Sequence, residues 1–179
     1  MFPLIALCLA FLFLATVLYA GSSLASWYPT SSRDYNTIAK HAALKKGQTL
    51  LEIGCGDGRV CFELARRFPN STIYGIELSY GLYVLCKLKA WAYGQRNVQF
   101  LFGNALKRNL ASYDVIYVYG LPKTVNGPLK QMLLQTTKEA VRIISYTFEI
   151  KNWPGRAKKY PKQSEGWVYV YQKNSHPTK

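Results

Sequence analysis

A short apolar run that leads into three glycines at alternate positions constrains the fold of this chain more than any other feature. Residues 49–53 have the length and composition of a buried strand, and Gly54, Gly56 and Gly58 follow at once. Residues 59–68 then show the apolar spacing of a helix. A strand, a glycine turn and a helix in this order bring the backbone close to an adenosine-type ligand in open α/β sheets. The segment therefore predicts an α/β fold with a ligand site at the carboxyl end of its first strand.

The rest of the chain alternates between strand-like and helix-like segments. This alternation implies right-handed crossovers and a Rossmann-like, doubly wound, mostly parallel sheet with helices on both faces. The Lys- and Pro-rich stretch 151–165 is expected to be a long loop. Strands are predicted over 49–53, 71–77, 98–102, 115–119, 141–148 and 167–171, and helices over 31–47, 59–68, 80–93 and 129–140.

The residues around the glycines indicate the charge of the ligand. The dinucleotide fingerprint G-x-G-x-x-G requires a glycine where this chain has Arg59, so that match fails. Glu52 at the strand end and Asp57 in the turn disfavour a pyrophosphate and suit a ligand that carries an ammonium or sulfonium group. We therefore predict S-adenosylmethionine as the cofactor. Its predicted contacts in this loop are Glu52, Gly54, Cys55, Gly56, Asp57 and Gly58.

Further cofactor contacts are predicted after the second and third strands. Glu77 follows Gly58 by 19 residues and can accept hydrogen bonds from both ribose hydroxyls, with Leu78 beside it. Asn104 and Ala105 place an amide where an adenine edge can be read. Thr30 is expected either to touch the carboxylate end of the cofactor or to cap a turn. An isolated strand-end Glu is more often a solvated surface acid, so the prediction rests on the ordered set.

This ordered set resembles the seven-strand (class I) methyltransferases, whose E/D-x-G-x-G-x-G loop matches Glu52 and the three glycines. Within that superfamily the chain is similar to small membrane-anchored protein-lysine methyltransferases. These are related to the mitochondrial enzymes that methylate the ATP synthase c subunit and the adenine nucleotide translocase. The resemblance covers about residues 28–172, through Tyr28-Pro29-Thr30, 51–59, Gly75-Ile76-Glu77-Leu78, Ala90-Trp91, Tyr113-Asp114, Tyr119-Gly120-Leu121-Pro122, Phe148 and Trp153.

Two departures from the family pattern affect these expectations. Asn104 stands where many relatives have Asp, which weakens the match at the adenine. The C-terminal part is short, so the last helix and hairpin of the superfamily are expected to be reduced.

The resemblance implies a slot for a lysine amine. Methyl transfer from a sulfonium to an amine requires alignment and exclusion of water, without a metal. The predicted catalytic positions are Tyr119 and Pro122 after the fourth strand and Trp153 after the fifth, with Phe148 as a further wall. Core or lid packing is the alternative for the aromatic residues.

The first residues form a separate part. Residues 2–20 carry no charge, and nineteen residues of helix span roughly 28 Å, close to the hydrocarbon thickness of a bilayer. We expect a transmembrane anchor over 1–21, a linker and pre-motif helix over 22–47, and the methyltransferase domain over 48–179. A cleaved signal or a buried helix is the alternative. Basic residues after the apolar run predict a single-pass protein whose catalytic domain faces the cytoplasm, or a matrix-equivalent side.

Charge and composition bear on the partners. The net charge of +14, with basic residues concentrated in 151–179 and at Lys45 and Lys46, suits anionic lipid. The four cysteines include no C-x-x-C pair and the two histidines lie far apart, so no metal site is predicted. The preferred function is a protein-lysine N-methyltransferase acting on membrane proteins. Alternatives are an RNA or membrane-lipid N-methyltransferase, or a non-catalytic scaffold that binds the cofactor. Nucleic acid is disfavoured by the anchor and by the lack of an amino-base motif at 119–122.

Overall fold

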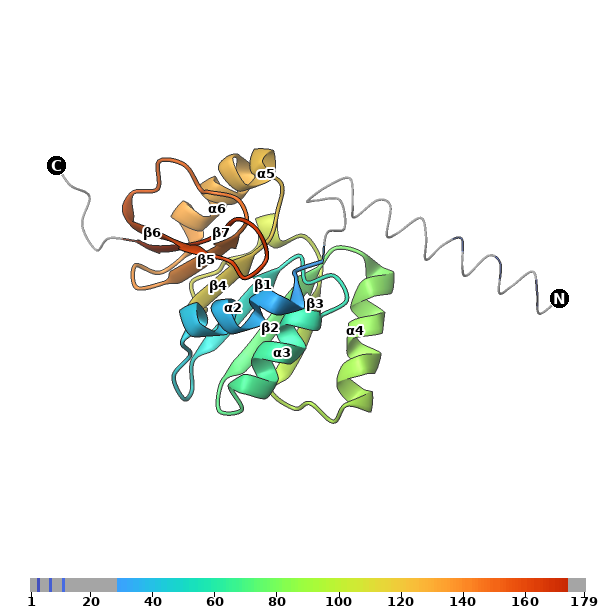
Figure 1. Cartoon of the computed structure of the whole chain (residues 1–179). Helices are drawn as coiled ribbons and strands as arrows, with labels where there is room; N and C mark the ends of the chain where they lie inside the picture. Colours follow the sequence, from blue (N-terminus) through green and yellow to red (C-terminus); the bar gives the residue numbers. More distant parts are fainter. Residues whose placement is uncertain (1–2, 4–6, 8–10, 12–28, 174–179) are drawn as a thin grey trace.

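A seven-stranded sheet with the order β3-β2-β1-β4-β5-β7-β6 forms the centre of the molecule (Figure 1). The computed structural model describes residues 3, 7, 11 and 29–173. β1 to β5 are mutually parallel, whereas β7 runs antiparallel to both β5 and β6. The strands are β1 (Thr49–Ile53), β2 (Thr72–Glu77), β3 (Val98–Phe102), β4 (Val115–Val118), β5 (Arg142–Tyr146), β6 (Gly155–Pro161) and β7 (Trp167–Lys173).

Helices cover both faces of this sheet, because its central strands are apolar on both sides. All four residues of β4 are buried, as expected for a strand between two helical layers. One face packs against α2 (Tyr35–Ala42), α3 (Arg59–Arg67) and α4 (Tyr80–Ala92), and the other against α5 (Pro122–Asn126) and α6 (Pro128–Thr136). Short 3-10 turns, η1 (Ser32–Asp34) and η2 (Ala105–Lys107), complete the described elements. The predicted Rossmann-like, mostly parallel α/β fold is confirmed.

The glycine turn after β1 packs tightly on β2. Gly75 in β2 lies directly beneath it, and a Cβ there would come within 2.8 Å of both Cys55 Sγ and Cys61 Sγ. Gly54 and Cys55 both donate their backbone N–H groups to the carbonyl of Ile76. A side chain at position 75 would therefore displace the turn that forms the ligand site.

The prediction of a long loop over 151–165 is wrong, and so is the expectation of a reduced hairpin. The segment contains β6, which pairs with β7 from Gly155–Lys173 to Pro161–Trp167. β6 is an edge strand whose Arg156, Lys158 and Lys159 are exposed, so it lacks the apolar alternation that identifies a strand in a sequence. Edge strands commonly carry lysines, which prevent pairing with other chains.

One helix is shorter than predicted, and another was not predicted. The helix predicted over 31–47 ends at Ala42, because Ala43 adopts a left-handed conformation with φ of 40°. Apolar residues of this helix, Ile38 and Ala42 among them, pack into the core against the sheet. The short helix α5 was not predicted, and Pro122 occupies its first turn, where proline is favoured.

The anchor predicted over 1–21 lies outside the described residues, apart from residues 3, 7 and 11. Among residues 3, 7, 11 and 29–173, no helix combines the length and the apolarity that crossing a bilayer requires. The anchor therefore stays a prediction.

Trp153 lies at the end of the sheet opposite to its predicted partners. Its indole N–H donates to the carbonyl of Gln172 at 3.2 Å, and its ring lies 5.7 Å from that of Tyr171. Gln172 pairs with Arg142, at the amino end of β5, whereas Tyr119 follows the carboxyl end of β4. Trp153 is buried in the core, so the structure does not bring it to the predicted lysine slot.

Replacing Trp153 tests this core position. Trp153→Ala should lower the free energy of unfolding by about 3 kcal/mol, because loss of a buried aromatic ring leaves a cavity. Trp153→Phe should cost much less, since it keeps the contact with Tyr171. Urea unfolding measures both. Unchanged stability of Trp153→Ala combined with lost turnover would return this residue to the lysine slot.

Candidate active site

A buried carboxylate joins the glycine turn to the start of α4. Glu77 Oε2 accepts a hydrogen bond from the Gly56 N–H and Oε1 accepts one from the Ser79 N–H, both at 2.8 Å. Burial raises the pKa of Glu77, and the backbone hydrogen bonds oppose that shift. A carboxylate has about four lone-pair sites, so acceptor capacity remains for ligand hydroxyls. This geometry fits the predicted contact of Glu77 with the two ribose hydroxyls.

The glycine turn has an open side and a packed side. Gly54, Gly56 and Gly58 all adopt positive φ, at 70°, 57° and 78°. A Cβ on Gly58 would lie 2.9 Å from the ring of Phe100, whereas one on Gly54 would meet no described heavy atom within 4 Å. The turn therefore rests on β3 through Gly58 and presents exposed backbone to a ligand at Gly54.

Asp57 does not act as a free negative charge in this turn. Its carboxylate lies 2.9 Å from the Arg59 guanidinium and 3.5 Å from Lys89 Nζ. Burial alone would raise the pKa of Asp57, but the hydrogen bonds and charge of Arg59, with the charge of Lys89, hold that pKa below its usual value. Asp57 thus organises the turn through its cationic neighbours.

Glu52 points into the protein. Its Oε2 accepts a hydrogen bond from the Cys61 thiol at 2.9 Å, and the side chain is buried beneath the turn. Burial raises the pKa of Glu52 to about 8, and the hydrogen bond from Cys61 opposes that shift. Of the two acids predicted to suit a cationic ligand, Glu52 is therefore turned inward with a raised pKa, and Asp57 is paired with Arg59 and Lys89.

The adenine side of the predicted site is built by the turn after β3. Asn104 Oδ1 accepts a hydrogen bond from the Leu106 N–H at 2.9 Å and so caps η2, while Ala105 is buried. The Asn104 side chain retains its Nδ2 group as a donor for a base edge. Leu78 is half-buried next to Glu77.

Thr30 lies at the carboxyl edge of the sheet, although it does not cap a turn. Its Oγ1 is 2.8 Å from the hydroxyl of Tyr117, the buried third residue of β4. This bond holds the segment before η1 against the ligand-facing edge. Whether Thr30 also contacts the cofactor stays a prediction.

Aromatic rings gather at the carboxyl ends of β4 and β5. We call Tyr117, Tyr119, Tyr146 and Phe148 the aromatic cluster. The Tyr119 ring meets Tyr146 edge-on at 4.7 Å and lies 6.3 Å from Phe148. Lys162 Nζ lies 4.2 Å above the Tyr146 ring. Pro122 is exposed at the start of α5, close in sequence to Tyr119. The cluster thus already accommodates one lysine amine.

Asp34 organises this cluster, and the sequence reasoning missed it. It is fully buried and accepts hydrogen bonds from the Tyr146 hydroxyl at 2.6 Å and from the Gln163 and Ser164 N–H groups at 2.7 and 3.0 Å. The Ser164 hydroxyl donates to the same carboxylate. Asp34 therefore ties the β6–β7 turn to an aromatic wall. Its only sequence signal was its position at the start of a helix.

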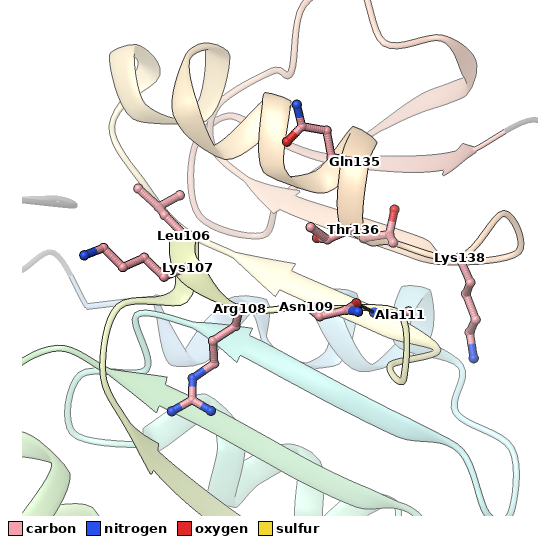
Figure 2. Close-up of a pocket in the computed structure, with 9 residues that line it drawn as sticks. Leu106, Lys107, Arg108, Asn109, Ala111, Gln135, Thr136 and Lys138 are labelled. Carbon is pink, nitrogen blue, oxygen red and sulfur yellow. Dashed lines mark hydrogen bonds between the residues drawn. The ribbon is translucent and has the colours of Figure 1, made fainter.

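A separate hollow of about 440 Å³ lies between η2 and the end of α6 (Figure 2). Lys107, Arg108 and Lys138 line it, and Lys138 is paired with Asp114 at 2.6 Å. These residues precede the amino ends of β4 and β5. The hollow therefore extends from η2, which follows the carboxyl end of β3, toward the amino ends of β4 and β5. In the described part of the chain, no group of three His, Cys, Asp or Glu side chains is placed to hold a metal ion.

The sheet order, the glycine turn and the acid at the end of β2 define an S-adenosylmethionine-dependent methyltransferase of the seven-strand class. Residues 52–157, more than half of the chain, match the ANTKMT methyltransferase domain. The chain belongs to that family.

Three relatives illustrate the similarity. A protein-lysine N-methyltransferase of Saccharolobus islandicus is 24% identical over 84% of this chain and 94% of its own length. A lysine N-methyltransferase of Caenorhabditis elegans, named for the c subunit of ATP synthase, is 33% identical over 50% of this chain and 46% of its own. An RNA methyltransferase of Salinibacter ruber, solved with S-adenosyl-L-homocysteine, superposes with a TM-score of 0.76 at 20% identity, covering 85% of this chain and 97% of that one.

Substitution of Glu77 tests the cofactor site. Glu77→Gln should weaken S-adenosylmethionine binding by about tenfold or more, because the amide offers one acceptor oxygen where the turn and α4 present two N–H donors. Calorimetric titration measures the affinity. The matched control is Glu139→Gln, which neutralises an exposed acid before β5. Equal affinities for wild type and Glu77→Gln would remove Glu77 from the site.

The raised pKa of Glu52 in the folded protein predicts a pH dependence of the free energy of unfolding. Because the folded-state pKa lies near 8, above the ordinary 4.5, the folded protein binds the extra proton between these values, and stability falls as pH rises through that window. Glu52→Gln keeps an acceptor for Cys61 and should remove this part of the slope. Urea unfolding from pH 5 to pH 8.5 compares the two proteins. Identical slopes would show that Glu52 does not titrate there.

Proposed function

We propose that the protein is a protein-lysine N-methyltransferase that modifies lysines of membrane-associated proteins. The observation that carries the proposal is the aromatic cluster at the carboxyl ends of β4 and β5, where the amine of Lys162 lies over the ring of Tyr146 and donates a hydrogen bond to Thr147 Oγ1. Two of its relatives, in an archaeon and a nematode, bear the names of lysine methyltransferases. The family assignment supports the methyl transfer, and the cluster supports lysine as the acceptor.

The residues of the cluster make an amine reactive by excluding water. A free lysine has a pKa near 10.4, so the neutral nucleophile is scarce at neutral pH. Desolvation lowers the pKa of Lys162, which lies against Tyr146, and a substrate amine beside Tyr119 meets the same conditions. The cofactor, held by Glu77 and the glycine turn, supplies a methyl group on a sulfonium. The carbonyls of Tyr119 and Gly120 orient the amine, and Pro122 shapes the rim.

Attachment to a membrane brings such a domain close to its substrates. The uncharged run over 2–20 would act as a single-pass anchor, with the catalytic domain on the cytoplasmic or matrix-equivalent side. The surplus of basic residues over acids, which gives a net charge of +14, attracts the domain to anionic lipid.

An RNA methyltransferase is the second candidate, because the similar fold in Salinibacter ruber belongs to one. That likeness concerns the fold, and basic charge with exposed aromatic rings also suits single-stranded RNA. A lipid N-methyltransferase and a non-catalytic scaffold complete the alternatives. The three enzymatic candidates transfer the methyl group to protein, RNA or lipid, and the scaffold transfers none.

Labelling separates these functions. The purified full-length chain is incubated with methyl-labelled S-adenosylmethionine and a membrane extract, and protein, RNA and lipid fractions are counted. We expect label in protein, recovered as methyl-lysine after acid hydrolysis. The Glu77→Gln chain is the control for background. Label in RNA or lipid would establish the corresponding alternative, and no label above background would favour the scaffold.

Two tyrosines that flank β4 give this experiment a matched pair of variants. Tyr119→Leu removes a wall of the cluster at the carboxyl end, and should reduce lysine labelling by about tenfold or more while cofactor affinity stays near wild type. Tyr113→Leu removes the same ring at the amino end, where it packs on Tyr74, and should label normally. Equal losses in both variants would assign Tyr119 to packing alone.

A further inference from the structure

The outer side of α4 is apolar where a helix that faces water is normally polar. Tyr80, Leu88 and Trp91 are exposed by 58%, 59% and 84%. With the half-buried Val84 they recur at helical spacing along one side. We call these four residues the α4 stripe. A contiguous row of exposed apolar side chains is typical of an interaction site.

The neighbouring helix shows that this pattern is not a requirement of packing on the sheet. α3 covers the same face of the sheet and buries Val60 and Leu64, while its outer side carries Arg66 (Figure 1). In α4 the only fully buried described residue is Cys86. Tyr83 and Ala90 pack against the core from the inner side of α4, whereas the three exposed apolar residues lie outside it.

The charges around the stripe have one sign. Between Glu77 and Val98, which spans α4 and the turn after it, the sequence holds no Asp or Glu, but it holds Lys87, Lys89 and Arg96. Lys87 is exposed and falls on the same side of α4 as Leu88 and Trp91. Lys89 turns inward to the Asp57 carbonyl. A partner that covers the stripe meets cations and apolar rings together.

We propose that the α4 stripe contacts the surface of an anionic lipid bilayer. Trp and Tyr side chains favour the headgroup level, where a ring can be buried while its polar end stays wet. Lys87 adds attraction to anionic headgroups, and α4 carries no Asp or Glu that would repel them. A helix with apolar and basic residues on one side lies in the plane of such an interface. The proposal concerns the orientation of the domain and does not depend on the acceptor of the methyl group.

Footprinting with hydroxyl radicals tests this contact on the full-length chain in phosphatidylcholine–phosphatidylserine vesicles. Trp91 is 84% exposed and Trp167, on β7, is 41% exposed, so in water Trp91 should be oxidised roughly twofold faster. Docking of the stripe should reverse this order in vesicles. If Trp91 is still oxidised faster than Trp167 in the vesicles, α4 faces water and the proposal is wrong.

A charge placed in the stripe supplies the matched variant. Leu88→Asp should restore fast oxidation of Trp91 in vesicles, since a carboxylate is repelled by the anionic surface. Gln131→Asp adds the same charge to an exposed position of α6 on the other face and should leave Trp91 protected. Protection of Trp91 that disappears when the protein is diluted at constant lipid would identify a second copy as the partner. That result, or protection unaffected by Leu88→Asp, would overturn the proposal.

Discussion

The structure depends on satisfying one buried carboxylate at the end of β2. Glu77 receives the N–H of Gly56 from one side and the N–H of Ser79 from the other, and so fixes the glycine turn relative to the start of α4. An unpaired carboxylate at this depth would be costly, so the two segments are held together by the need to satisfy it. Gly75 beneath the turn allows the close approach that makes these bonds possible. The predicted contact with the ribose and the organisation of the backbone therefore rest on the same side chain.

The parallel part of the sheet and the cofactor turn were predictable because their signals are local. Apolar runs at 49–53 and 98–102 coincide with β1 and β3, and positive φ at Gly54 matches the need for glycine. β6 was not predictable, because an edge strand of lysines has no apolar alternation. Asp34 was missed for a different reason: its partners, Tyr146 and Ser164, lie more than 100 residues away. Long-range hydrogen bonds leave no periodic trace in a sequence.

Charge was the property that sequence reasoning handled least well. Glu52 and Asp57 were predicted to suit a cationic ligand, yet burial raises the pKa of the first and Arg59 pairs with the second. A sequence shows which groups can ionise, whereas burial and partners decide whether they do. The same holds for the aromatic residues. The sequence predicted both Tyr119 and Trp153 as walls of the lysine slot, but strand register places them at opposite ends of the sheet.

Strand order also separates the two basic regions of the domain. β3 and β6 are the opposite edges of the sheet, and six strand spacings put them about 29 Å apart. Salt screens charge over about 8 Å at physiological ionic strength. A bilayer that meets the α4 stripe beyond β3 would therefore leave Lys158 and Lys159 of β6 in water, beyond its electrostatic reach. On the proposal for the α4 stripe, these lysines keep an unpaired edge strand from binding other chains, and membrane contact would involve the side of the domain where apolar rings accompany the positive charge.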